Sequence, residues 1–187
     1  MPITVTPTAI PDVLLIEPAV FRDERGFLME SFNARDFREA TGVQQALSFV
    51  QDNHSHSKRG VLRGLHYQLV RPQGKLVRVT RGEIFDVAVD LRRSSPTFGK
   101  WVGARLSEEN HRQLWLPTGF AHGFLVLSET ADVQYKATEL WAPEHGRSIR
   151  WDDPSLGIEW PVGAGVTPLL SARDAAAGSF AEAECFD

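Results

Sequence analysis

The residues with the clearest chemical potential lie in one short stretch, RGVLRGLHYQLVRPQGKLVRVTRG, from Arg59 to Gly82. It contains His66 and Lys75 within a segment that alternates like a pair of β-strands. An imidazole titrates near neutral pH, and an ammonium group can bind an anion or support a developing oxyanion. The stretch can therefore be a metal site, a phosphate clamp or an acid/base centre.

The spacing of glycines and histidines allows the metal site to be tested first. Five residues separate Gly60 from His66, six separate Lys75 from Gly82, and Pro117-Thr-Gly119-Phe-Ala-His122 follows later in the chain. This frame resembles the two metal-binding motifs of cupin-type β-barrels. The resemblance implies a cupin barrel.

The metal ligands of that frame are missing. Gln68 stands where the second histidine of the first motif is expected, and Lys75 stands where the glutamate is expected. His66 and His122 remain, and two imidazoles form a weak ligand set. His54-Ser-His56 lacks a carboxylate at a useful spacing and is more typical of a loop or strand edge. We expect no metal and no cofactor.

A barrel interior with a histidine and a lysine suits proton abstraction next to a carbonyl group. A base removes the C–H proton, a cation supports the enolate oxygen, and an acid reprotonates the carbon from the opposite face. A carboxylate on the other nitrogen of the histidine would fix its tautomer and raise its basicity. His66 and Lys75 are the candidate base and cation.

Seven segments extend this reading over the chain from about Phe21 to Ala177. They are DERGFLMESF, FVQDNHSHSKRGVLRGLHYQ, QGKLVRVTRGEIFDVAVDLRRSSPTFGKWVGARLS, RQLWLPTGFAHGFLVLSE, YKAT, IRWDDPSLGIEWP and LSARDAAA. In these segments the chain resembles the dTDP-4-dehydrorhamnose 3,5-epimerases, cupin-fold enzymes of deoxysugar biosynthesis. Several segments are long and unusual, so the resemblance is specific.

The resemblance implies a role for each residue at a family motif. His66 corresponds to the general base, and Asp174 corresponds to the aspartate that pairs with it. Lys75 corresponds to the lysine that stabilises the enolate at the 4-keto oxygen. Tyr135 corresponds to the acid on the opposite face, and His122 to a second histidine at the sugar.

The resemblance also implies substrate-binding residues. Arg25 and Arg63 correspond to arginines near the diphosphate, a role that suits the guanidinium group. Arg173 stands where some relatives have lysine. The remaining family substrate-binding positions are occupied by Glu30, Gln51, Asp52 and Asn53.

Each of these residues also has a purely structural interpretation when it is taken alone. Lys75 would be a solvated charge at a strand end, Tyr135 a barrel aromatic, and Asp174 a helix N-cap. Arg63 would form a surface ion pair. We expect the tryptophans to pack in the interior, although one could stack on thymine: Trp101, Trp115, Trp141, Trp151 and Trp160.

The chain departs from the family after the YKAT segment. Relatives often read YYAP there, with an acidic residue three positions beyond the proline. This chain has Leu140-Trp141-Ala142-Pro143 and then Gly146, so a phenol and a carboxylate are missing; Glu144 or Trp141 could compensate. The departure concerns the nucleotide end, and it leaves open an epimerase that inverts only one carbon.

Composition limits the classes of protein that fit. The chain has 187 residues, of which 42% are hydrophobic and 24% charged, a balance typical of a globular protein. The net charge of −4 argues against nucleic acid binding, so local Arg and Lys must hold an anionic ligand. The single cysteine, Cys185, suits the cytoplasm. We expect no signal peptide and no membrane segment.

The elements that must position these residues are mainly short strands. A helix is expected over Ala34 to Thr41, with Asn33 as N-cap and Gly42 as stop, and single turns near Ser107–Asn110 and Asp174–Gly178. The β-rich segments are Val13–Pro18, Gly26–Phe32, Leu76–Val79, Glu83–Leu91, Trp101–Leu106, Gly123–Leu127 and Val133–Leu140.

We therefore expect one domain over residues 1–187, an all-β, cupin-like jelly roll (double-stranded β-helix) with a few short helices. The expected enzyme inverts C3 and C5 of dTDP-4-dehydro-6-deoxy-D-glucose. The family resemblance further implies a homodimer with exchanged N-terminal strands.

Overall fold

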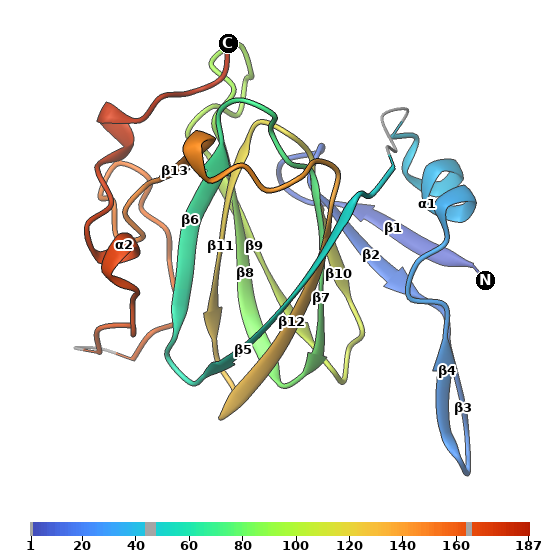
Figure 1. The fold of residues 1–187 in the computed structure, drawn as a ribbon. Coiled ribbons are helices and arrows are strands. Elements are labelled where there is room, and N and C mark those ends of the chain that lie inside the picture. Colours follow the sequence, from blue (N-terminus) through green and yellow to red (C-terminus); the bar gives the residue numbers. More distant parts are fainter. Residues whose placement is uncertain (1, 44–47, 164–165) are drawn as a thin grey trace.

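The computed structural model describes residues 2–43, 48–163 and 166–187. Within them, most of the chain forms two antiparallel sheets that face each other (Figure 1). One sheet has the order β1 (Ile3–Pro7), β2 (Leu14–Pro18), β10 (Gln113–Leu116), β7 (Lys75–Arg81), β12 (Thr130–Ala137) and β5 (Gln51–Lys58). The other has the order β13 (Gly146–Ser148), β6 (Leu62–Gln68), β11 (Phe120–Val126), β8 (Glu83–Asp90) and β9 (Trp101–Ser107). The expected all-β jelly roll is confirmed.

The strands that bear His66 and Lys75 lie in different sheets. Although the sequence alternates there like a strand pair, β6 hydrogen-bonds to β11 and β13, whereas β7 hydrogen-bonds to β10 and β12. Side chains of a strand alternate between the two faces of its sheet. Lys75 shares the interior face of β7 with Val77 and Val79, which belong to the apolar cluster between the sheets. The two candidate residues therefore approach one interior from opposite walls.

Strand β5 is polar along its whole length, with the sequence QDNHSHSK. It was absent from the expected strands because it lacks alternating apolar residues. Its pairing with β12 nevertheless covers every position from Gln51 to Lys58. As an edge strand it presents alternate polar side chains to the interior and to the outer face.

The helices are short, and α1 (Ala34–Thr41) has the predicted bounds. The Asn33 side chain accepts hydrogen bonds from two backbone N–H groups of its first turn, and Gly42 ends it with φ of 66°. Helix α2 (Ala172–Ala175) differs from the prediction, because Ser171 is its N-cap and Asp174 lies inside it. The side chain of Asp174 is thus not needed as the N-cap. Two single 3₁₀ turns, η1 (Pro143–His145) and η2 (Phe180–Glu182), complete the set.

The hairpin of β3 (Val20–Asp23) and β4 (Gly26–Met29) projects away from the two sheets (Figure 1). Its apolar side chains are unusually exposed: Phe21 by 54%, Phe27 by 53% and Leu28 by 65%. Near its turn, Arg22 Nη2 lies 3.0 Å from His111 Nε2. The hairpin therefore adds little to the core of its own chain.

The C-terminal segment covers the outer face of the five-stranded sheet. An apolar cluster there joins strand residues such as Leu62 and Val87 to Leu156 and Phe186. Four of the five tryptophans pack in apolar clusters as expected, but Trp141 is 64% exposed, so the packing interpretation is wrong for it. Among the described residues, no helix is long and apolar enough to cross a membrane.

Candidate active site

His66 and Asp174 form a close pair at the edge of the five-stranded sheet. His66 Nε2 lies 2.5 Å from Asp174 Oδ1, and the Asp174 side chain is only 4% exposed. Burial acts to raise the pKa of Asp174, but hydrogen bonds from His66, Ser171 and the Gly64 backbone outweigh it and lower the pKa. An ionised Asp174 accepts a hydrogen bond from Nε2–H, which leaves Nδ1 of His66 as the unprotonated nitrogen that can act as a base.

Gly64 allows β6 to approach β11 closely beside this pair. Its φ is 131°, and a Cβ atom there would lie 2.5 Å from Gly123 Cα. The register of the two strands shifts between His122 and Phe124, while His122 remains directly opposite His66. Directly paired residues project to the same face of a sheet, so both imidazoles face the interior.

Lys75 enters the same interior from the opposite sheet. Its Nζ lies 5.9 Å from the centre of the Tyr135 ring. Burial lowers the pKa of Lys75 to about 8, while the negative charge of Asp86 acts in the opposite direction. The ammonium form is still the main form at pH 7, and the side chain is only partly exposed to water.

Tyr135 lies on β12 with its ring 6.4 Å from the His122 ring. Burial raises the pKa of its phenol, and the positive charge of Arg63 opposes that shift. A phenol with a raised pKa keeps its proton near neutral pH and can donate it to a carbanion. Arg63 is held by a bond from its Nε to Ser57 Oγ, and it forms no ion pair with any described residue.

Asp86 was missed by the sequence interpretation. It is fully buried on β8, and its Oδ1 lies 2.8 Å from His122 Nε2. Burial lowers the pKa of His122, and Asp86 opposes that shift. A signal was present in the sequence, because Asp86 interrupts the apolar strand sequence EIFDVAVD.

Besides Arg63, His122 and Arg173, the other five expected substrate-binding residues fall into three groups. Gln51 and Asn53 line a cleft of about 450 Å³ together with Tyr135, Leu140 and Trp141. Their side chains are joined by a 3.0 Å hydrogen bond, and Gln51 Oε1 also accepts from the Trp141 backbone at 2.8 Å. This cleft extends the interior site towards the loop in which the chain departs from its relatives.

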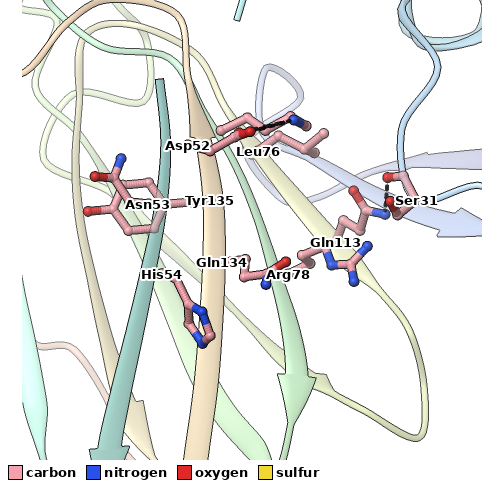
Figure 2. Close-up of a pocket in the computed structure, with 10 residues that line it drawn as sticks. Ser31, Asp52, Asn53, His54, Leu76, Arg78, Gln113, Gln134 and Tyr135 are labelled. Atoms are coloured by element: carbon pink, nitrogen blue, oxygen red, sulfur yellow. Dashed lines mark hydrogen bonds and ion pairs between the residues drawn. The ribbon is translucent and has the colours of Figure 1, made fainter. Parts of the chain in front are cut away.

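Asp52 belongs to the second group because it lies on the outer face of the sheet. It pairs there with Lys136, whose Nζ is 3.0 Å from Asp52 Oδ1. Figure 2 shows Asn53 and Tyr135 on one side of β12, with Arg78 and Gln113 on the other. A cavity of about 270 Å³ on this outer face is lined by Ser31, Asp52, Asn53, His54, Leu76, Arg78, Gln113, Gln134, Tyr135 and Lys136.

Arg25 and Glu30 form the third group, which lies near the projecting hairpin and α1, apart from the candidate residues of the interior. Arg25 lies in the turn of the projecting hairpin, with its side chain 86% exposed and bonded to Asp23. Glu30 accepts a hydrogen bond from Asn33 near α1. Arg173, by contrast, lies beside Asp174 and donates from Nε to Ser148 Oγ at 3.1 Å.

The donor set in the barrel does not fit a metal ion. The amide of Gln68 is used to bond the backbone of Arg71, Leu140 and Ala142. Lys75 places a cation where a cupin glutamate would be a ligand. Among the described residues there is no cluster of three or more His, Cys, Asp or Glu side chains suited to a metal.

The chain is similar to known proteins over almost its whole length. The sequence model of the dTDP-4-dehydrorhamnose 3,5-epimerase family matches residues 7–182. The chain belongs to the dTDP-4-dehydrorhamnose 3,5-epimerase family. It is 64% identical over 181 residues to the Pseudomonas aeruginosa protein of that name, covering 97% of this chain and 98% of the relative.

Solved structures of this epimerase family share the fold. The Legionella pneumophila 3,5-epimerase, solved in complex with dTDP-4-keto-L-rhamnose, superposes with a TM-score of 0.93 at 52% identity, covering 97% of this chain and 95% of that one. A 3′-monoepimerase from Streptomyces bikiniensis, in complex with dTDP-quinovose, gives 0.85 at 36% identity, covering 94% and 87%. The second similarity shows that the same fold also serves an enzyme named for a single carbon.

Proposed function

We propose that this chain converts dTDP-4-dehydro-6-deoxy-D-glucose to dTDP-4-dehydro-L-rhamnose by inverting C3 and C5, without a cofactor. The observation that carries the proposal is that His66, Lys75 and Tyr135 face one interior from three different strands. The substrate has its own activating group, because the 4-keto group acidifies the C–H bonds on both sides of it. The relative that is 64% identical bears the same name as this activity.

His66 is the proposed base. Its hydrogen bond to Asp174 directs Nε2–H away from the substrate and leaves Nδ1 to take the proton from C3 or C5. The imidazolium that forms is stabilised by the Asp174 carboxylate at 2.5 Å. The same pair can act at both carbons, since each lies next to the same carbonyl.

Lys75 is the proposed partner of the enolate. When the C–H proton leaves, negative charge develops on the 4-keto oxygen, and a nearby ammonium stabilises it. This stabilisation is strong because Lys75 is largely withdrawn from water, as its lowered pKa of about 8 indicates.

Tyr135 is the proposed acid. Inversion requires that the new C–H bond forms on the face opposite the base, and Tyr135 lies on β12, in the other sheet from His66. Its raised pKa favours the protonated phenol that this step consumes. The His66 imidazolium then releases its proton to solvent and the Tyr135 phenolate takes one up, which restores both groups for the next turnover.

The nucleotide end is the proposed role of the surrounding polar and aromatic residues. Arg63 and Arg173 supply positive charge for the diphosphate. Gln51 and Asn53 line the cleft, and the exposed Trp141 offers a surface for the base. Trp141 lies in the segment where the sequence departs from that of its relatives. Its ring can take the place of the phenol that relatives have at the position of Leu140.

We also propose a homodimer in which the β3–β4 hairpin of one chain completes the site of the other. Arg25 lies on the hairpin, away from the catalytic residues of its own chain, and the exposed Phe27 and Leu28 favour contact with a second copy.

A cytoplasmic location is also proposed, because one cysteine permits no internal disulfide.

Solvent exchange tests the function directly. The protein is incubated with dTDP-4-dehydro-6-deoxy-D-glucose in deuterium oxide, and NMR follows the signals of H3 and H5. Deuterium at both carbons supports inversion at both, and deuterium at one supports a single-carbon epimerase. No deuterium at either carbon contradicts both. His66→Ala is the control, expected to be folded and without exchange.

A further inference from the structure

The interior contains a second histidine–aspartate pair that the mechanism above does not use. His122 and Asp86 are joined by a 2.8 Å contact between Nε2 and Oδ1. Both side chains are buried, with exposures of 8% for His122 and 0% for Asp86. His122 lies directly opposite His66 in the β6–β11 pairing, so the two pairs are neighbours in one sheet.

The surroundings of Asp86 are unusual for a residue that only supports the fold. Its second oxygen, Oδ2, is buried and has no hydrogen-bond partner among the described residues. Buried carboxylates are normally bonded at both oxygens, as Asp90 on the same strand is by Arg92, Ser95 and Thr97. The incompletely bonded Asp86 charge therefore calls for a nearby cation, and the half-buried Lys75 on the facing sheet is a cation whose pKa this charge acts to raise.

The contact at Nε2 also determines the state of the imidazole. A carboxylate accepts hydrogen bonds, so His122 must place its proton on Nε2. Nδ1 then has no proton while the ring is neutral, and no described residue bonds to it. An unprotonated ring nitrogen is an acceptor for a hydroxyl group, and a sugar ring presents hydroxyl groups.

We propose that Asp86 is a positioning residue for the epimerisation: it holds His122 as the Nε2–H tautomer, so that Nδ1 accepts from a sugar hydroxyl, and it balances the charge of Lys75. This inference rests on the proposed function for its catalytic consequence. Its structural part concerns the free protein and can be tested without substrate.

Imidazole nitrogen NMR tests the structural part. In protein labelled with ¹⁵N-histidine, the His122 signals are assigned by their loss in His122→Gln. We expect one neutral Nε2–H tautomer between about pH 6 and 8. An Nδ1–H tautomer, or a mixture of both, would overturn the proposal whatever the enzyme is found to catalyse.

Two substitutions then separate the hydrogen bond from the charge. Asp86→Asn keeps an oxygen that can accept from Nε2–H but removes the negative charge. We expect the same tautomer, with the alkaline limit of deuterium exchange moved down by about one pH unit, because Lys75 loses its proton more readily. The titratable groups that face this site are His66 on β6, Lys75 on β7 and Tyr135 on β12.

Asp86→Ala removes both the charge and the acceptor. We expect mixed His122 tautomers and exchange slower by roughly 10- to 100-fold, the usual effect of losing an orienting partner. Asp90→Asn is the matched control, a buried carboxylate on the same strand that should change stability but not the His122 tautomer or the pH limit. Unchanged tautomer, rate and pH limit in both Asp86 variants would overturn the proposal.

Discussion

At the scale of single residues, the site depends on charges that burial would normally disfavour. Asp174 keeps a lowered pKa although it is 4% exposed, because three hydrogen bonds stabilise its carboxylate. Lys75 shows the opposite balance, since burial lowers its pKa to about 8. Each group is thereby placed in the protonation state that proton abstraction requires at neutral pH.

Asp174→Asn tests the orientation of the base. The amide has the same shape but lacks the negative charge that stabilises the imidazolium formed at His66, so we expect kcat to fall by roughly 10²- to 10⁴-fold. Deuterium exchange and circular dichroism measure activity and folding. Asp153→Asn is the control, because Asp153 is similarly buried but its carboxylate bonds Ser155 and Phe180 and no histidine. A loss of less than about threefold in Asp174→Asn would contradict the pairing.

The lowered pKa of Lys75 predicts that activity declines at alkaline pH. Its folded pKa of about 8 lies below the usual value of 10.5, so the ammonium is present below pH 8 and is lost as the pH rises through it. We expect kcat to decline above about pH 8 for this reason. Lys75→Met should lower kcat by roughly 10²- to 10³-fold and remove this limit.

The lowered pKa of Lys75 also makes the stability of the protein depend on pH in a defined direction. The folded state binds the Lys75 proton less readily than the unfolded chain does. The charged Lys75 therefore destabilises the folded state fully below pH 8, and this destabilisation decreases as the pH rises from 8 towards 10.5. Lys75→Met should therefore raise the free energy of unfolding at pH 7. Urea unfolding at pH 7 and 10 measures this, and an equal gain at both pH values would contradict the assigned pKa.

At the scale of elements, the close approach of β6 and β11 holds the two histidines opposite each other. In Gly64→Ala the new Cβ would meet Gly123 Cα at 2.5 Å and the His122 oxygen at 2.8 Å. We expect a loss of about 1–3 kcal/mol in stability and a decline in exchange, as the strands separate. Gly178→Ala, where the nearest atom is 3.8 Å away, should be neutral in both measurements.

Which elements the sequence predicts depends on whether their residues alternate in polarity. Strands β7, β8 and β9 are recognisable because apolar residues mark their interior face, and α1 because Asn33 and Gly42 mark its ends. Strand β5 has no such marker, since all eight of its residues are polar. Its place in the sheet comes from pairing with β12, which local sequence does not encode.

The candidate site likewise includes residues that the sequence identifies and contacts that it does not predict. His66, Lys75, Tyr135 and Asp174 were identified through family segments, but the contact between His66 and Asp174 joins residues 108 positions apart. Spacing along the chain does not predict such a contact, because it follows from the docking of α2 against β6. Asp86 was not identified from the sequence, because its partner His122 lies on another strand, 36 positions away.

At the scale of the whole molecule, the chain must hold a doubly charged diphosphate although its net charge is −4. Positive charge is therefore needed locally, and we expect Arg63 and Arg173 to provide part of it. Arg25 is the third arginine, but it lies on the projecting hairpin. A hairpin with exposed Phe21, Phe27 and Leu28 is better explained by a partner that covers it than by solvent.

Mixed dimers distinguish exchange of the hairpin from a site built within one chain. Arg25→Ala should lose roughly 10-fold or more in kcat/KM through its charged hydrogen bonds, and His66→Asn should be inactive. Co-expression of the two variants should restore about a quarter of wild-type activity, because half the dimers then have one intact site. Arg63→Ala with His66→Asn is the control, since both residues belong to one chain's site and no intact site can form. Failure of the Arg25 pair to recover activity would contradict exchange of the hairpin.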